Sequence, residues 1–387
     1  MRYFLLRMKR FCGFITGFVF FISGVLKIMD PVGAGLVMNE YFRFFHLDFL
    51  DFAAKLTGVL FALAEVIVGI GLITGVWRRI VAPIAVAMQG FFTLLTLILL
   101  IFNPEMDCGC FGEAIHITHG ETFVKNIILL ALLLIYYIPS AQLGQTKKRK
   151  YVAFGVVTIS ATIFCIYSWM SIPLIDYTDF KSGTHLGLSE ADPTDAYESV
   201  FVYERDGVQQ TVTLDNLPDS TWTFVRTETV RNGYNDDDSA ILSFYDNNGN
   251  YADSLATQGK VMIVSVYGSK LKPAVKERIT RFLTNAGNAG FNALLLTSSE
   301  QIANEFENAY ISDYKTLITL NRSNAGVSYF NDGYLVRKWS ARSYPDVSEL
   351  EELSDEDMTE AIIKHDTNNS LTFQAFLLYV FAVMLLL

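Results

Sequence analysis

Six apolar runs, each near the length that an α-helix needs to cross a lipid bilayer, constrain this chain more than any other feature. They cover roughly residues 11–29, 56–76, 80–102, 123–138, 151–170 and 371–387. About 20 apolar residues span the hydrocarbon core of a bilayer as a helix. The first run continues into Lys27-Ile28-Met29-Asp30-Pro31 without a small-residue cleavage site, so we interpret it as a retained span. The sequence predicts a polytopic α-helical protein in contact with the lipid bilayer.

Basic clusters at alternate ends of these runs indicate how the chain is oriented. Arginine and lysine gather at residues 7–10 before the first run, at 78–79 after the second, and at 147–150 before the fifth. If each run crosses once, the positive-inside rule places all three clusters in the cytoplasm. The pattern predicts a multi-pass protein of the cell inner membrane with both chain ends cytoplasmic. Residues 171–370, and the connection after the third run, are then extracytoplasmic.

The long region between the fifth and sixth runs has the composition of an acidic soluble domain. Residues 171–370 contain 31 acidic and 16 basic residues. Nucleic-acid binding needs a basic surface, so this balance excludes a nucleic-acid partner. A strand-rich segment is expected over 171–259. After it, expected strands are 261–266, 293–296, 315–321, 327–330 and 335–339, and expected helices are 273–286 and 300–309.

The order of these elements over residues 260–350 is typical of an extracytoplasmic α/β thioredoxin-like domain. In that fold a reactive Cys-x-x-Cys pair follows the first core strand, at the N-terminus of a helix. Here the corresponding segment, Tyr267 to Pro273, has no cysteine. The segment before the 327–330 strand, Asn324-Ala325-Gly326, lacks the usual cis-proline. We therefore expect this domain to dock a partner without exchanging disulfides itself.

The Cys108-Gly109-Cys110 pair is the one obvious chemical motif, and it follows the third run at an outer membrane edge. Two thiols separated by one residue can form a strained, accessible disulfide, which suits electron exchange. The glycine permits the tight turn, and the location outside the membrane is oxidising. We interpret the pair as redox-active. The alternative is a pair, oxidised or reduced, that only shapes the loop. The other cysteines, Cys12 and Cys165, lie in apolar runs and are expected to act as small hydrophobic residues.

Two histidines close to this pair leave a metal site open. Cys108, Cys110, His116 and His119 form a conceivable zinc set, because two cysteines and two histidines are common zinc ligands. Their spacing is not a common zinc-finger spacing. The histidines can equally be polar residues at the entrance of a helix.

Glu65 lies near the middle of the second run, where a carboxylate is costly. We expect it to face the interior of the bundle with Lys27 or Lys125 as its partner. Its functional interpretation is a proton or quinone site. The alternative is a buried polar contact that fixes helix packing.

Several short motifs extend this interpretation to a family. They are Ser23 to Pro31 at the end of the first run, Glu65 with Gly69 and Gly71, Asp107-Cys108-Gly109-Cys110-Phe111-Gly112, Thr122-Phe123 and Lys125-Asn126. Over residues 1–140 the chain resembles the DoxX-like membrane family and, within it, the methylamine-utilisation MauE family. With its later domains the arrangement resembles DoxX-type proteins of Bacteroidetes-like bacteria.

The resemblance implies a four-helix membrane domain over residues 1–140, with Cys108 and Cys110 as the residues carried over. The remaining predicted parts are a fifth span at 151–170, the two outer segments at 171–259 and 260–350, and a terminal span at 371–387. The implied role is extracytoplasmic thiol-disulfide redox or electron transfer. The pair would pass electrons between a membrane carrier such as a quinone and a periplasmic protein docked on the outer domain. Glu65 is the candidate for coupled protonation. The alternative is a non-enzymatic scaffold or assembly factor of the cell envelope with a structural cysteine pair.

Overall fold

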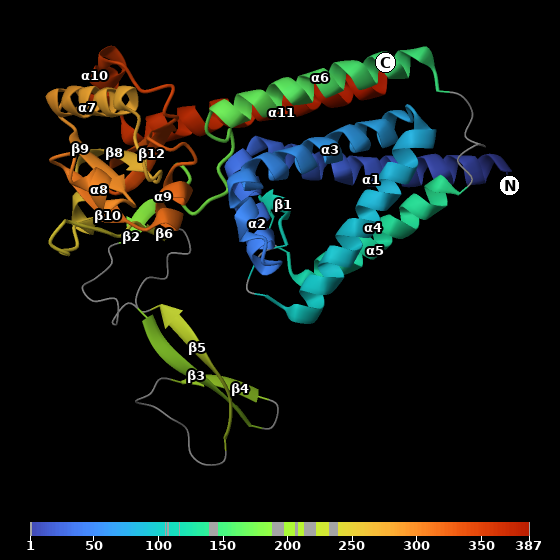
Figure 1. Cartoon of the computed structure of the whole chain (residues 1–387), viewed down its shortest axis with the longest axis horizontal. Helices are drawn as coiled ribbons and strands as arrows, with labels where there is room; N and C mark the ends of the chain where they lie inside the picture. Colours follow the sequence, from blue (N-terminus) through green and yellow to red (C-terminus); the bar gives the residue numbers. More distant parts are fainter. Residues whose placement is uncertain are drawn as a thin grey trace. The chain divides into compact units, whose positions relative to one another are not determined.

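The computed structural model describes residues 2–104, 106, 108–115, 117–138, 146–187, 197–205, 208–212, 222–231 and 239–386. The chain divides into two compact units, and each is described by itself. The membrane unit comprises Met1–Thr178, Trp339–Ser343 and Ile363–Leu387, and the sheet unit comprises Asp179–Lys338 and Tyr344–Ile362. Figure 1 labels helices and strands of both units and colours the chain from blue at the N-terminus to red at the C-terminus.

Six helices are long and apolar enough to cross a membrane, within the described residues, and they coincide with the six predicted runs. They are α1 (Arg2–Met29), α3 (Ala54–Thr74), α4 (Arg78–Phe102), α5 (His119–Tyr137), α6 (Lys148–Met170) and α11 (Met358–Leu386). This confirms a multi-pass helical membrane part. α11 begins well before the predicted residue 371, because the Asp357 side chain accepts hydrogen bonds from the backbone amides of Thr359 and Glu360 and caps a polar first segment.

One further helix, α2 (Pro31–Phe44), was not expected from the sequence. The Asp30-Pro31 pair looked like the end of the first span, but it starts a new helix. The Asp30 side chain accepts from the Gly33 amide at 2.9 Å, and proline at the first helical position has the required φ. A short 3₁₀ segment, η1 (Asp48–Ala53), then leads into α3.

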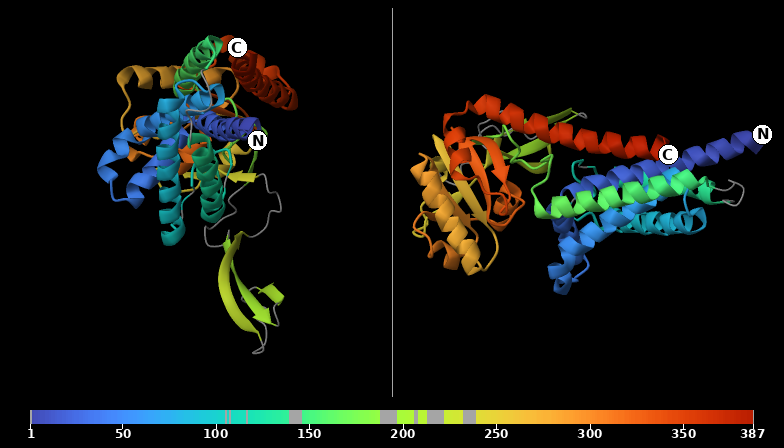
Figure 2. Two further views of the ribbon diagram at one scale, coloured as in Figure 1. Left: turned by 90° about the vertical axis from the view of Figure 1, so that its right-hand side faces the viewer. Right: turned by 90° about the horizontal axis from the view of Figure 1, so that it is seen from above.

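The helices of the membrane unit pack largely in pairs. α1 approaches α3 closely at Gly24, where an added Cβ would lie 2.6 Å from the Ala62 carbonyl oxygen. α4 is joined to α5 by the Asn126 side-chain amide, which donates to Thr96 Oγ1 at 3.2 Å. In Figure 1 the α4–α5 pair runs at an angle to α1 and α3, and the right-hand view of Figure 2 shows α6 alongside α1. α6 also contacts α11, where Phe164 and Phe376 stack with centroids 4.4 Å apart.

The sheet unit is built on an eight-stranded sheet with the order β6-β2-β12-β11-β8-β9-β10-β7. Its strands are β2 (His185–Gly187), β6 (Ser239–Ile241), β7 (Phe244–Tyr245), β8 (Lys260–Val266), β9 (Asn292–Thr297), β10 (Ala309–Ser312), β11 (Gly326–Asn331) and β12 (Tyr334–Trp339). β8 is buried along nearly its whole length, parallel to β9 and antiparallel to β11. Of the strands that precede residue 260, β2 and β6 extend this sheet at one edge and β7 extends it at the other.

Helices cover both faces of this sheet. In Figure 1, α7 (Pro273–Asn288) and α10 (Val347–Asp355) lie on one side of the strands and α9 (Tyr314–Leu320) on the other. The helix predicted for 273–286 is present as α7, which buries Ile279, Phe282 and Ala286. The 3₁₀ segment η4 (Asp253–Ala256) precedes β8. A separate three-stranded sheet, order β4-β3-β5, consists of β3 (Tyr197–Arg205), β4 (Val208–Val212) and β5 (Thr223–Arg231).

Most elements expected after residue 260 are present, but two predictions were wrong. The segment predicted as a strand at 315–321 is α9, because Asp313 accepts from the Lys315 and Thr316 amides and caps a helix. The helix predicted for 300–309 stops early: α8 ends at Ala303, and β10 then pairs in parallel with β9. Side-chain capping decided the first segment and strand pairing decided the second, in each case against the pattern of apolar residues.

Candidate functional site

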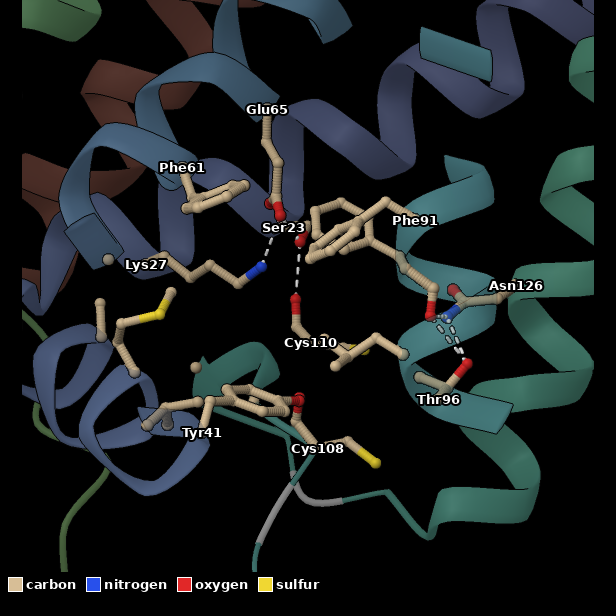
Figure 3. Close-up of a pocket in the computed structure, with 18 of the residues that line it drawn as sticks. Ser23, Lys27, Tyr41, Phe61, Glu65, Phe91, Thr96, Cys108, Cys110 and Asn126 are labelled. Atoms are coloured by element: carbon tan, nitrogen blue, oxygen red, sulfur yellow. Dashed lines mark hydrogen bonds and ion pairs between the residues drawn. The ribbon is translucent and has the colours of Figure 1, made fainter. Parts of the chain in front are cut away.

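The cysteine loop, defined here as Cys108, Gly109 and Cys110, lies between the end of α4 and the short strand β1 (Cys110–Glu113). Two side chains from other helices hold its backbone. The Tyr41 hydroxyl of α2 donates to the Cys108 carbonyl at 2.7 Å, and the Ser23 hydroxyl of α1 donates to the Cys110 carbonyl at 2.6 Å. Burial raises the pKa of the Tyr41 phenol, so that it remains a donor. Figure 3 shows the loop between these two anchors.

Cys108 is paired with His119, the first residue of α5. Its sulfur lies 2.8 Å from His119 Nδ1, and only 5% of the residue is exposed. The other ring nitrogen, Nε2, lies 3.2 Å from the Pro104 carbonyl oxygen. Because a carbonyl can only accept, Nε2 carries a hydrogen, and in the neutral imidazole Nδ1 then accepts from the Cys108 thiol. From the sequence, His119 was considered as a metal ligand or as a polar residue at a helix entrance, since a contact between residues eleven positions apart in a loop leaves no periodic signal.

The α5 end that carries His119 is itself fixed in place. Thr118 and Glu121 form a reciprocal capping box: the Thr118 hydroxyl accepts from the Glu121 amide, and the Glu121 carboxylate accepts from the Thr118 amide at 3.0 Å. The imidazole is therefore presented to Cys108 by a rigid helix start.

No disulfide joins the four cysteines, all of which lie among the described residues. Cys110 is partly exposed, whereas Cys108 is buried. Cys12 and Cys165 are buried within α1 and α6, where they pack in apolar clusters. The two thiols of the cysteine loop are thus inequivalent: one is accessible, and the other is buried against an imidazole.

The structure describes three residues of the four-ligand metal set considered above, Cys108, Cys110 and His119. Cys108 and His119 are adjacent, but His116 lies outside the described residues. Among the residues that are described, no group of three or more histidine, cysteine, aspartate or glutamate side chains is placed to hold a metal ion. That alternative stays a prediction.

Glu65 is buried in α3, with 3% of its surface exposed, and Lys27 is its ionic partner. Lys27 Nζ lies 2.7 Å from Glu65 Oε1, and the Ser23 hydroxyl lies 2.8 Å from Oε2. The other suggested partner, Lys125, instead places Nζ 4.5 Å from the centre of the Phe111 ring. Since Ser23 also reaches the Cys110 carbonyl, a single hydroxyl connects the buried ion pair to the cysteine loop (Figure 3).

A cavity of about 480 Å³ joins these features. Its wall is formed by α1 to α5 and the cysteine loop, and it is mostly apolar and aromatic. The polar or charged side chains among its lining residues include Ser23, Lys27, Tyr41, Glu65, Gln89, Thr96, Lys125 and Asn126. The aromatic lining includes Phe61, Phe91 and Phe92. Tyr41, Gln89 and Thr96 were not predicted as site residues, because polar residues inside or beside an apolar run do not indicate which face of the helix they occupy.

The match with a known family falls on this region. Residues 2–139 match the family model of methylamine utilisation protein MauE. This confirms a MauE-like membrane domain that carries the cysteine loop, the Lys27–Glu65 pair and the cavity. Residues 197–231, a range that includes the strands β3, β4 and β5, match a domain of unknown function, DUF8463.

A curated relative adds a second, more distant similarity. Protein TlpB of Flavobacterium psychrophilum is 26% identical over 162 residues, which is 40% of this chain and 42% of the relative. The chain thus spans less than half the length of that relative. No solved structure matches this chain.

Proposed function

We propose that this protein is a component of thiol-disulfide exchange at the outer face of the inner membrane, with Cys108 and Cys110 as its redox pair. The observation that carries the proposal is the 2.8 Å contact between Cys108 Sγ and His119 Nδ1, with a second thiol two residues away. A neighbouring protonated imidazole stabilises a thiolate, which is the reactive form of cysteine. The similarity of residues 2–139 to MauE and the distant similarity to TlpB support a membrane protein of this kind.

The different environments of the two thiols assign their roles. In the oxidised protein, a thiolate of the partner attacks the accessible Cys110 sulfur, a new intermolecular S–S bond forms, and Cys108 leaves as a thiolate held by the His119 imidazolium. A second thiolate of the partner then attacks the partner's sulfur atom in this mixed disulfide. A disulfide forms within the partner, and Cys110 leaves as a thiolate. The partner loses two electrons and gains a disulfide, and the loop gains a dithiol. Burial protects the Cys108 sulfur from direct attack.

The positions of the basic clusters support an orientation in which both chain ends are cytoplasmic and residues 171–370 are extracytoplasmic. This orientation puts the cysteine loop on the same side of the membrane as the sheet unit. An oxidising periplasmic compartment is where stable disulfides are made.

The sheet unit is inferred to be a thioredoxin-like domain without thiols that docks the partner protein. Four neighbouring strands, β12-β11-β8-β9, have the order expected for that fold, with β8 parallel to β9 and antiparallel to β11. The segment after β8 is tied to the one before β11, because Asn324 Oδ1 accepts from the Tyr267 and Gly268 amides. In place of a reactive thiol, these two segments present a fixed polar turn that could bind the partner protein.

Trapping with a mass-tagged alkylating reagent in cells tests the proposal. The wild-type loop is expected to be found in both dithiol and disulfide states, and the Cys108→Ser/Cys110→Ser variant is expected to leave partner proteins reduced. Cys165→Ser, a buried thiol in α6, is the matched control and should behave as wild type. A loop found in only one redox state, together with unchanged partner disulfides in the double variant, would show a structural pair in a cell-envelope scaffold.

His119→Asn is expected to slow alkylation of Cys108 at neutral pH by about tenfold or more, because the thiolate loses its cationic neighbour. The measurement is the rate of iodoacetamide modification in a Cys110→Ser background, across a range of pH. His46→Asn, an exposed histidine that does not line the cavity, is the control. Equal rates and equal pH profiles for the two variants would mean that His119 only packs against the thiol.

A further inference from the structure

We infer that the cavity below the cysteine loop binds the ring of a quinone-class carrier, which enters from the bilayer and accepts the electrons of the Cys108–Cys110 dithiol. This inference rests on the proposed function, since it names the acceptor that returns the loop to its disulfide. Three features of the described residues lead to it: access from lipid, a wall that stabilises a reduced ring oxygen, and the position of the thiols.

Access is from the side of the bundle that a bilayer would cover. Phe61, Phe91 and Leu94 all line the cavity, yet they are 38%, 50% and 58% exposed. They belong to α3 and α4, both of span length. The Phe61 and Phe91 rings stack with an interplanar angle of 12° and centroids 6.2 Å apart. A ligand carried in the membrane can therefore reach the cavity past two aromatic faces.

The wall of the cavity has the charge and donors that a quinone ring requires. The charged side chains that line the cavity are Lys27, Lys125 and Glu65. Because Glu65 is paired with Lys27, Lys125 supplies an excess of one positive charge. Lys27 Nζ lies 5.8 Å from the centre of the Phe92 ring. A cation in a low-dielectric site stabilises the oxyanion that forms as a quinone is reduced. A hydrocarbon acyl chain has no oxygen atom that this positive charge could stabilise.

The size and polarity of the cavity also suit a ring with a carbonyl at each end. Its volume of about 480 Å³ lies in the usual range for small-molecule sites. Figure 3 shows one polar corner at Ser23, Lys27 and Glu65 and another at Thr96 and Asn126, with the Phe91 ring between them. Two separated polar corners joined by aromatic walls match the para-carbonyl pattern of a quinone.

The cysteine loop forms part of the same wall, which allows a balanced two-electron step. The Cys110 thiolate adds to a ring carbon and forms a C–S bond, which places the electron pair on the ring oxygens. The Cys108 thiolate, its proton taken up by His119, then attacks Cys110 Sγ, so that an S–S bond forms as the C–S bond breaks. The ring leaves as a quinol that has taken up the two thiol protons. The products are one disulfide and one quinol.

Binding is tested on the full-length protein in detergent, with ubiquinone-1 as the probe. The Cys108→Ser/Cys110→Ser variant is used, so that affinity is measured without electron transfer. Leu95→Trp, which fills the cavity from α4, is expected to weaken binding by more than about tenfold. Leu100→Trp, on the same helix but 41% exposed and not lining the cavity, should leave the affinity unchanged. Lys125→Met, which creates no bulk, should weaken binding several-fold and keep the protein folded.

The outcomes separate this inference from the proposed function. Equal quinone affinity in Leu95→Trp, Lys125→Met and Leu100→Trp would overturn the inference, as would full competition by decanol, which would indicate an acyl-chain site. Loop thiols that cycle in cells while the protein shows no quinone binding would overturn the inference and keep the proposed function. Quinone binding that follows the expected pattern, with loop thiols that never change state, would keep the ring site and overturn thiol exchange.

Discussion

Replacing Glu65 by leucine is expected to lower the free energy of unfolding by about 3–5 kcal/mol, because it leaves the Lys27 ammonium inside the bundle without its carboxylate. The carboxylate is 4% exposed and the lysine side chain 15% exposed, and the two groups meet at 2.7 Å. Ser23 would also lose one of its two partners. The measurement is thermal or denaturant unfolding of the purified protein in detergent.

Two further variants establish whether the lost stability belongs to the ion pair. Lys27→Met combined with Glu65→Leu should recover most of the loss, since an apolar pair of similar volume often replaces a buried ion pair without cost. Glu277→Leu removes a surface pair between Glu277, 74% exposed, and Arg281, 69% exposed, and should cost only about 0.3–0.5 kcal/mol. A double variant as unstable as the sum of its single variants would show that the two side chains are not coupled.

Gly109→Ala is expected to disrupt the structure of the cysteine loop. Gly109 has a φ of +59°, and a Cβ there would overlap the Val37 side chain of α2. The left-handed backbone alone costs an alanine about 1–2 kcal/mol, and the collision adds to that. Because the loop cannot keep its place, the Cys108–His119 contact should be lost, and the loop thiols should become equally reactive toward iodoacetamide.

Gly112→Ala is a closely matched control for this substitution. Gly112 has nearly the same backbone angle, φ +63°, but the nearest atom to its added Cβ is Lys27 Cγ at 3.7 Å. It therefore carries the backbone strain without the collision. Adding Val37→Ala to Gly109→Ala should restore much of the difference in reactivity between Cys108 and Cys110. Identical behaviour of Gly109→Ala and Gly112→Ala would contradict the steric explanation.

The sequence by itself determined the membrane part and most of the central sheet. A bilayer leaves no partner for backbone polar groups, so long apolar runs must become helices, and all six were located in advance. The strand β8 was also predicted, since a short run rich in β-branched residues between turn residues is typical of a buried strand. The wrong assignment at 315–321 arose where Asp313 decided the outcome, because one capping hydrogen bond is not visible in an apolar pattern.

The chemistry of the site was decided by tertiary structure. The sequence identified Cys108, Cys110 and Glu65, and it suggested Lys27 as one of two partners. It could not choose Lys27 over Lys125, because the two lie on different helices and only packing decides which one meets the carboxylate. Nor could it show that His119 faces Cys108, that Tyr41 and Ser23 hold the loop, or that a cavity joins them. These contacts depend on how five helices pack together. The periodicity of the sequence indicates the faces of single helices but not which side chains of different helices meet.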